Sequence, residues 1–231
     1  MKTMYNLNSA MLFLLSCCIV FQVYPDGQRR EGRFSVAQRA RTNWHALIQQ
    51  ADSIYYQVPD ANAGRTAAQE QELVSIRELY TRVTQQNDDA SARAHAQMAL
   101  ADMCTFGDGG AVDYARARNL YECAASQRVN MVINARATVR LGDIYKLGEG
   151  VPANDVRARS YYTIAAVQNY DLESKALAQA ILGNMYYFGE GVPVDYVHAR
   201  ELLRQAGGQN VNQEVQRAAH DRLAEMDNLG I

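Results

Sequence analysis

The feature that most constrains this chain is a short stretch of sequence that occurs more than once. Residues 141–152 read LGDIYKLGEGVP and residues 182–193 read LGNMYYFGEGVP, an offset of 41 residues. A more diverged copy, LADMCTFGDGGA, begins another 41 residues earlier, at Leu100. Self-similarity with a period of about 20 to 50 residues is the signature of a solenoid, in which similar structural units stack on one another.

Each copy predicts two helices joined by a sharp turn. Apolar residues at helical spacing, such as Leu141, Ile144 and Tyr145, precede two glycines that are one residue apart. Glycine enters the left-handed region of backbone space without strain, so we expect these glycines to be structural and to end the first helix. A residue suited to capping a second helix follows each pair. The glycines are Gly107, Gly109, Gly148, Gly150, Gly189 and Gly191, and the capping residues are Asp113, Asn154 and Asp195.

The second helices carry a small residue at one fixed position of the repeat, namely Ala117, Ala158 and Ala199. Alanine at a repeated position lets two helices approach closely, and larger residues such as Tyr121 and Tyr162 follow it to supply buried bulk. We expect each copy to form an antiparallel helix pair that cannot bury its apolar faces alone. Stacking of neighbouring pairs completes the core and predicts an all-α fold.

The second and third copies resemble the Sel1-like repeats, a family related to the tetratricopeptide repeats. The family pattern runs roughly A-x-x-x-L-G-x-x-Y-x-x-G-x-G-V-x-x-D, and the second copy matches it with Leu141, Gly142 and Tyr145. The first copy departs from the pattern at Ala101 and Cys104. The resemblance implies an all-α, right-handed solenoid of stacked antiparallel helix pairs. It is specific for the fold and not for a function.

These patterns divide the chain into four expected parts. They are a signal peptide or short membrane anchor at 1–24, a polar linker at 25–36, a degenerate N-terminal helical repeat or cap at 37–91, and the repeat array at 92–231. Within the array we expect repeats at about 94–125, 135–166 and 176–207, followed by a capping helix at 211–228.

The N-terminal part of the chain favours export. An apolar run from Ala10 to Phe21 has the length of a signal-peptide core rather than of a membrane-spanning helix. Cys17 is a candidate lipidation site, because residues 14–17 loosely resemble a bacterial lipoprotein box. We expect a protein that is exported or membrane-tethered in the cell envelope or periplasm, with membrane contact only through this segment. Arginines close behind the run keep open the alternative of an anchor on the cytoplasmic side.

Composition and motifs argue against several classes of function. A formal net charge of −2 and a pI near 6.1 give no reason to expect a nucleic acid partner. The four histidines form no metal-binding pair and no G-x-S-x-G motif occurs, so we expect no metal, no cofactor and no catalytic residue. The acidic residues of the turns, Asp108, Glu149 and Glu190, would repel a phosphate and are expected to be solvated.

The function that this fold predicts is that of a scaffold, which binds another protein or a peptide on the concave face of the array. In each first helix the residue two positions after the leading leucine is polar, and we expect it to face outward because its neighbours are buried. The candidate binding residues are Asp102, Asp143 and Asn184, with Thr105, Lys146 and Tyr187 one turn further along. We expect replacement of the first three by alanine to cost little stability. The competing interpretation is a polar row that only keeps a helix face soluble.

A cell-envelope enzyme or binder is the alternative function. A cysteine-rich branch of Sel1-like proteins has been linked to binding or hydrolysing β-lactams, which resemble peptidoglycan fragments. That branch pairs cysteines in each repeat, whereas here only the first copy has two, Cys104 and Cys123. In an antiparallel pair these two lie roughly 15 Å apart along the helices, beyond the reach of about 7 Å between Cα atoms that a disulfide allows. We expect both to remain free thiols.

Overall fold

The computed structural model of the chain describes residues 43–59, 64–86 and 88–231. The chain divides into two units, Met1–Thr42 and Asn43–Ile231, and the described residues belong to the second. The predicted signal or anchor segment 1–24, the linker 25–36 and Cys17 therefore lie outside the described residues. No helix in the described part combines the length and the apolar character that crossing a membrane requires.

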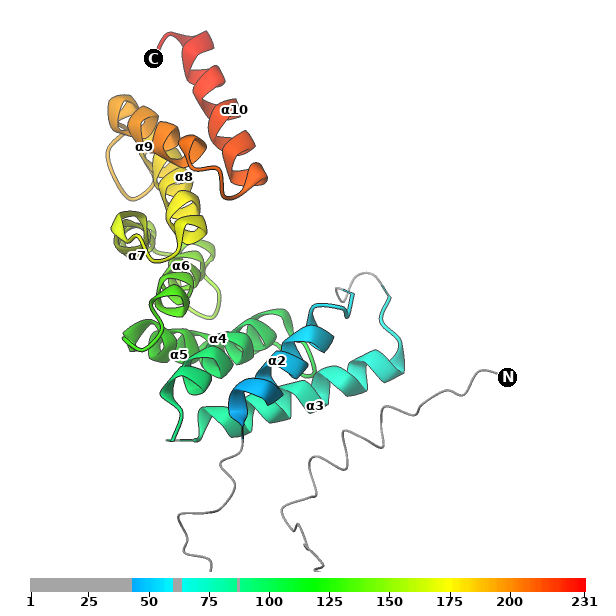
Figure 1. Ribbon diagram of the computed structural model, residues 1–231. Helices are drawn as coiled ribbons and strands as arrows, with labels where there is room; N and C mark the ends of the chain where they lie inside the picture. Colours follow the sequence, from blue (N-terminus) through cyan, green and yellow to red (C-terminus); the bar gives the residue numbers. More distant parts are fainter. Residues whose placement is uncertain (1–42, 60–63, 87) are drawn as a thin grey trace, which may run out of the picture. The chain divides into compact units, whose positions relative to one another are not determined.

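The described part is all-α, and no strand occurs within these residues (Figure 1). Two helices precede the periodic part, α2 (Trp44–Tyr55) and α3 (Ala67–Thr84). The three repeats follow as the pairs α4 (Ala90–Phe106) and α5 (Tyr114–Ser126), α6 (Met131–Leu147) and α7 (Asp155–Val167), and α8 (Leu172–Phe188) and α9 (Tyr196–Gly208). The last helix is α10 (Gln213–Leu229).

The helices stack in chain order, and one side of the stack is continuous. Each helix from α2 onward packs against the next one along the chain. The first helices of successive units also touch, because α4 contacts α6, α6 contacts α8 and α8 contacts α10. The second helices α5, α7 and α9, all within the described residues, make no close backbone contact with one another. The first helices therefore form the inner layer of an all-α solenoid, which is the fold that the repeat predicted.

Both sets of helices start at residues that repeat with the period of the sequence. The predicted caps Asp113, Asn154 and Asp195 each accept a hydrogen bond of 2.9 Å from the backbone N–H three residues on. The first helices have capping positions of their own at the same spacing, which are Asp89, Asn130, Asp171 and Asn212. Asp171 alone among these four makes no capping bond, because its carboxylate accepts from Ser174 at 2.7 Å and pairs with Arg136 at 3.0 Å.

The first glycine of each turn ends the first helix, as expected. Gly107, Gly148 and Gly189 have φ angles of 76°, 75° and 76° and form left-handed C-caps. The next backbone N–H then bonds to the carbonyl five residues back, as Glu190 does to Met185 at 2.9 Å. The turn is the same in all three repeats, although the first repeat has diverged in sequence.

The second glycine of each turn has another role, because it touches the unit before it. Its φ is also positive, at 64°, 67° and 66° for Gly109, Gly150 and Gly191. A Cβ atom on Gly150 would lie 2.6 Å from Cβ of Tyr114, and one on Gly191 would lie 2.7 Å from the carbonyl carbon of Asp155. Tyr114 and Asp155 are the first residues of α5 and α7. Each turn therefore rests directly on the second helix of the preceding unit, with no side chain of its own between them.

We expect Gly191→Ala to lower the free energy of unfolding by more than the strain of an alanine at positive φ alone would. The alanine meets the strain of positive φ, about 1 kcal/mol, and a collision with the Asp155 backbone that adds about 1–3 kcal/mol. Gly230→Ala is the matched control, since Gly230 has φ 67° and no atom within 4 Å of an added methyl group. Urea unfolding measures both free energies, and equal losses would show that the close contact between repeats is not required.

The core within each repeat follows the predicted positions. Ala117, Ala158 and Ala199 are fully buried, and so are Tyr121 and Tyr162. The first helix makes room for these rings with a small residue: a Cβ atom on Gly142 would lie 2.5 Å from the Tyr162 ring. The two helices of a repeat are therefore held close by small residues on both of them, with one large side chain filling the space.

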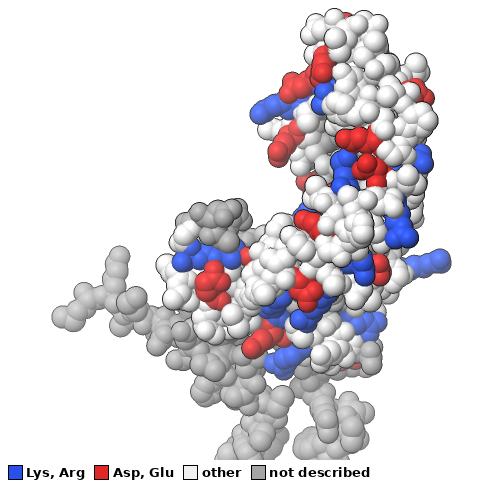
Figure 2. Space-filling model, turned by 180° about the vertical axis from the view of Figure 1, so that it is seen from behind, with Lys and Arg blue, Asp and Glu red and all other residues white. Residues whose placement is uncertain are grey.

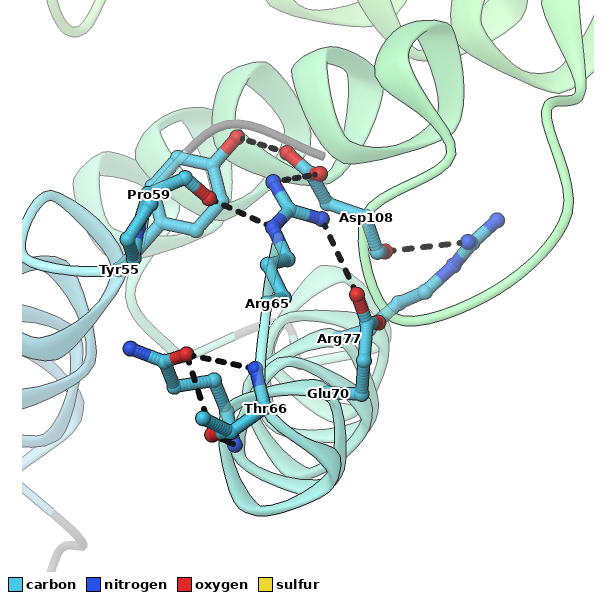
Figure 3. A network of polar contacts seen from close by, with 8 residues as sticks. Tyr55, Pro59, Arg65, Thr66, Glu70, Arg77 and Asp108 are labelled. Carbon is cyan, nitrogen blue, oxygen red and sulfur yellow. Dashed lines mark hydrogen bonds and ion pairs between the residues drawn. The ribbon is translucent and has the colours of Figure 1, made fainter. Parts of the chain in front are cut away.

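The turn of the first repeat differs from the expectation, because Asp108 is buried rather than solvated. Its side chain is only 7% exposed, and its carboxylate oxygens lie 2.7 Å from Nη2 of Arg65 and 2.7 Å from the Tyr55 hydroxyl (Figure 3). Arg77 of α3 donates to the Asp108 carbonyl oxygen at 3.2 Å, and Nε of Arg65 donates to the Pro59 carbonyl at 2.6 Å. These contacts fasten α2 and α3 to the first turn of the array.

Cys104 and Cys123 are free thiols, as expected, and they differ in exposure. We expect iodoacetamide to alkylate Cys123 and to leave Cys104 unmodified in the native protein, because Cys104 is buried and Cys123 is exposed. Peptide mapping by mass spectrometry measures both adducts, and unfolding in urea provides the control in which both react. Equal native rates would contradict the packing of Cys104 in α4.

Candidate functional site

The six candidate binding residues all lie on the layer of first helices. Asp102 and Thr105 are in α4, Asp143 and Lys146 in α6, and Asn184 and Tyr187 in α8. All six side chains are partly exposed, and each has a partner within the chain. The row is therefore not a simple solvated face, and its role in binding another protein stays a prediction.

Asp102 and Asp143 are tied to buried tyrosines of the second helices. The Tyr121 hydroxyl donates to Oδ1 of Asp102 at 2.6 Å, and the Tyr162 hydroxyl donates to Oδ1 of Asp143 at 2.7 Å. Because both tyrosines are fully buried, the two carboxylates are the acceptors that satisfy their hydroxyl groups. The expectation that these carboxylates face outward therefore holds only in part, since one oxygen of each belongs to the core.

Arg140 of α6 links two repeats, because it lies between the same two carboxylates. Its Nε is 3.5 Å from Oδ1 of Asp102, and its Nη1 is 3.7 Å from Oδ2 of Asp143. Its guanidinium carbon is also 5.9 Å from the centre of the Phe106 ring. One cation thus serves two carboxylates. Burial raises the pKa of both Asp102 and Asp143 above the usual range, although Arg140 opposes the shift.

The same arrangement recurs two periods later around Arg222 of α10. Its Nε donates to the Asn184 side-chain oxygen at 3.0 Å, and its guanidinium pairs with Glu225. The guanidinium carbon is 4.8 Å from the centre of the Phe188 ring and 4.9 Å from that of Tyr187. The Tyr187 hydroxyl donates to Glu225 at 3.1 Å. The candidate residues of α8 therefore form a bridge to the next first helix.

The last two candidate residues are also engaged within the chain. Thr105 donates its hydroxyl to the carbonyl of Ala101 at 3.0 Å. Lys146 pairs with Glu190, the acidic residue in the turn of the next repeat. This ion pair corrects the expectation that Glu190 is simply solvated. The equivalent Glu149 makes no ion pair with any described residue.

An apolar row, which the sequence analysis missed, runs beside the polar one. The last residue of each first helix, directly before the capping glycine, is large, apolar and exposed. The members of this apolar row are Phe106, Leu147, Phe188 and Leu229, with exposed fractions of 55%, 68%, 53% and 59%. One exposed apolar side chain says little, but four at equivalent positions form a regular feature. The signal was in the sequence, since these residues also recur every 41 positions.

Phe106 of the apolar row and Asp102 and Asp143 of the polar row line a groove of about 430 Å³ between α2 and the first helices α4, α6 and α8. Its apolar lining includes Tyr55, Tyr56, Met98, Phe106, Ile133, Val139 and Leu177. Its charged lining comprises Asp102, Arg136, Arg140, Asp143, Asp171 and Glu173, together with His95. A concave surface where apolar side chains and convergent polar groups lie together is typical of a binding site.

The periodicity, the turns and the paired helices are those of a known family. A profile of the Sel1 repeat matches residues 94–129, 135–170 and 176–211. This chain is a Sel1-repeat protein. Its three Sel1 repeats start at the residues that the sequence pattern predicted, and each contains one helix pair with its two-glycine turn.

Solved structures that resemble this Sel1-repeat chain include two bacterial proteins. A protective antigen present in uropathogenic Escherichia coli strains, which displays an SLR fold, is 30% identical over 68% of this chain and 30% of its own, with a TM-score of 0.54. A Sel1 repeat protein from Oxalobacter formigenes is 30% identical over 55% of this chain and 88% of its own, with a TM-score of 0.44. The chain thus spans less than a third of the Escherichia coli antigen. No curated protein matches the sequence.

The charges of the Sel1-repeat protein are mixed rather than segregated. On the face that Figure 2 shows, acidic and basic residues are interspersed. Nucleic acids are bound through extended basic patches, so this face does not favour them. Within the described residues, no group of three or more His, Cys, Asp or Glu side chains is placed to hold a metal ion.

The hydrogen bond from Tyr162 revises the expectation that alanine costs little at Asp143. We expect Asp143→Ala to lower the free energy of unfolding by about 1–3 kcal/mol, because the buried Tyr162 hydroxyl loses its acceptor. Asp143→Asn keeps a side-chain oxygen for that bond and removes the buried charge, so its stability at neutral pH should equal or exceed that of the parent.

The pH dependence of this pair follows from the raised pKa of Asp143. A carboxyl whose folded pKa lies above its unfolded value stabilises the fold fully below the unfolded pKa and loses that contribution as the pH rises through the folded one. Any advantage of Asp143→Asn should therefore vanish below about pH 4, where the parent is protonated as well. Thermal unfolding across this range measures both effects, and an Asn variant as unstable as the Ala variant would contradict the role of the hydrogen bond.

Proposed function

We propose that this Sel1-repeat protein is a scaffold that binds a segment of another protein along the groove of its first helices. Sel1 repeats generally mediate protein interactions, which supports a role in protein binding. The proposed position of the binding site is supported by the apolar row, whose first member Phe106 lines the groove. Aromatic and aliphatic side chains that a fold leaves exposed in a groove are typical anchors of a binding partner.

The spacing of the apolar row suits an extended segment. Packed helices lie about 8–10 Å apart, so successive members of the row are separated by roughly that distance. A segment in the extended polyproline II conformation advances about 3.1 Å per residue with three residues per turn, so every third side chain of such a segment points to the same side and meets the row. We therefore propose an extended segment with apolar residues at intervals of three.

The polar candidate residues contribute to this site in two ways. Asp102 and Asp143 line the groove, and each is an acceptor with lone pairs beyond those used by the buried tyrosine. Asn184 and Tyr187 lie around Arg222 beside Phe188, where they fix the position of the next anchor. Thr105 and Lys146 hold the backbone and the neighbouring turn. In this proposal the row supports and orients the apolar anchors.

No group of side chains among the described residues supports the alternative of an envelope enzyme. Proteins built from Sel1 repeats are also generally non-enzymatic. We also propose that the scaffold acts at the cell envelope, exported or tethered through the apolar run from Ala10 to Phe21. Its partner would then be a protein of that compartment.

The test removes the apolar anchors and leaves the fold. We expect the triple variant Phe106→Ala, Leu147→Ala and Phe188→Ala to keep its melting temperature within a few degrees, because exposed side chains contribute little to stability. Proteins that co-purify with the parent from the source cell should be lost from this variant, as measured by quantitative mass spectrometry.

The matched control alters equally exposed apolar residues on the second helices, with Ile164→Ala, Val167→Ala and Val197→Ala. This control should retain the partner. Loss of the partner from the control, or its retention by the first variant, would contradict binding at the groove.

A further inference from the structure

We infer that the segment bound in the groove carries a basic side chain next to a bulky apolar one, and that the groove selects it by charge. This inference rests on the proposed function, since it names the chemistry of the ligand of the same groove. Its basis is the balance of charged groups among the lining residues and the exposed aromatic surface beside them.

Carboxylates outnumber guanidinium groups in the lining of the groove. The acidic residues are Asp102, Asp143, Asp171 and Glu173, and the basic ones are Arg136 and Arg140. Arg136 is used by Asp171 at 3.0 Å, and Arg140 is shared between Asp102 and Asp143. Among the described residues, the only side-chain partner of Glu173 is the amide of Asn212, which donates a hydrogen bond of 2.8 Å. The groove therefore lacks cations for two of its four carboxylates.

The remaining titratable groups near the groove do not restore the balance. His95 faces Asp52 behind the lining, with 2.9 Å between Nε2 and Oδ2, so its ring nitrogen is engaged by a carboxylate outside the groove. Glu149 lies close to Asp143 and Arg140 without an ion pair of its own in the described part of the chain. Burial and the charge of Asp143 raise the pKa of Glu149. Two carboxylates, Asp102 and Asp143, thus share the one guanidinium of Arg140, and the charge of Glu149 acts on the same guanidinium.

Exposed aromatic surface lies beside these carboxylates. Phe106 and Tyr56 line the groove and are both well exposed, and the Phe106 ring already faces Arg140 at 5.9 Å. A lysine or arginine has an apolar stem that can pack on such a ring while its charged end reaches Asp143 and Glu149. A bulky apolar neighbour on the same segment would cover Tyr56. An acidic segment would meet repulsion, and a neutral one would leave the carboxylates without a cation.

The experiment compares three short fluorescein-labelled peptides with the full chain by fluorescence anisotropy. All three carry the same leucine and phenylalanine residues, and the positions between these are lysine in one peptide, glutamine in the second and glutamate in the third. We expect the lysine peptide to bind roughly tenfold more tightly than the glutamine peptide, and the glutamate peptide to bind most weakly. Salt of about 0.5 M should reduce the difference, because partly exposed charges are screened.

Two variants assign the preference to the groove. Asp143→Asn combined with Glu149→Gln should bring the lysine and glutamine peptides to within about twofold of each other, while the asparagine still accepts the Tyr162 hydrogen bond. The matched control, Glu122→Gln combined with Glu201→Gln, removes two exposed carboxylates from α5 and α9 and should keep the preference. Phe106→Ala should weaken all three peptides by a similar factor.

The outcomes separate this inference from the proposed function. Equal binding of the three peptides, tighter binding of the glutamate peptide, or a lysine preference that survives the Asp143 and Glu149 changes would overturn the charge selection. If the peptides bind in any of these three cases and Phe106→Ala still weakens their binding, the scaffold function stands. Binding of none of the peptides by a monomeric chain would count against the groove as a peptide site altogether. A chain that sediments as a dimer and binds none of them would place a second copy in the groove and overturn the inference.

Discussion

The solenoid depends on the direct contact between the turn of each repeat and the second helix of the unit before it. At Gly150 and Gly191 backbone meets the start of α5 and of α7 with no side chain between. A contact of this kind has no rotamer to adjust, so it fixes the distance between successive helix pairs. Because the same contact recurs in every repeat, equivalent residues of α4, α6, α8 and α10 come into line. The apolar row and the arginine bridges are consequences of that alignment.

The inner layer combines two kinds of bridge between first helices. Arg140 connects α6 to α4, and Arg222 connects α10 to α8, each through a polar side chain and an aromatic ring of the preceding first helix. At the equivalent position of α8 the chain has Ile181. The arginine at this position therefore alternates with an isoleucine along the layer, and α6 is linked to the two ends of α8 by the ion pairs of Arg136 with Asp171 and of Lys146 with Glu190. In the groove, Arg140 is shared by two carboxylates, which contributes to the excess of negative charge there.

The sequence was sufficient for those features that depend on the backbone of one repeat. The left-handed glycines, the caps of the second helices and the buried alanines could all be predicted, because each is a local requirement that recurs three times. The burial of Asp108 could not, since Arg65 and Tyr55 come from the segment before the periodic array. The acceptor role of Asp102 was also hidden, because the donor Tyr121 lies on the opposite helix and tyrosine was expected only to fill space.

The apolar row was missed for a related reason. Phe106 and Leu147 stand at helical spacing from the residues of the core, and such residues are normally counted as core themselves. Their exposure follows from the position of the turn, because each is the last residue of its helix and no further layer of helices covers it. The exposure of such a residue depends on the path of the chain after the helix, and the hydrophobic period of the helix does not contain that information.

The second helices α5, α7 and α9, all in the described part of the chain, make no close backbone contact with one another. Their starts are instead spaced by the turns at Gly150 and Gly191, which rest on the first residues of α5 and α7. Backbone contact therefore sets the distance between successive units at the turn end of the helices, and no equivalent contact joins the second helices at their other end. Resistance to bending is then unequal along the helices. The apolar row lies at the turn end, so its spacing is conserved when the solenoid flexes.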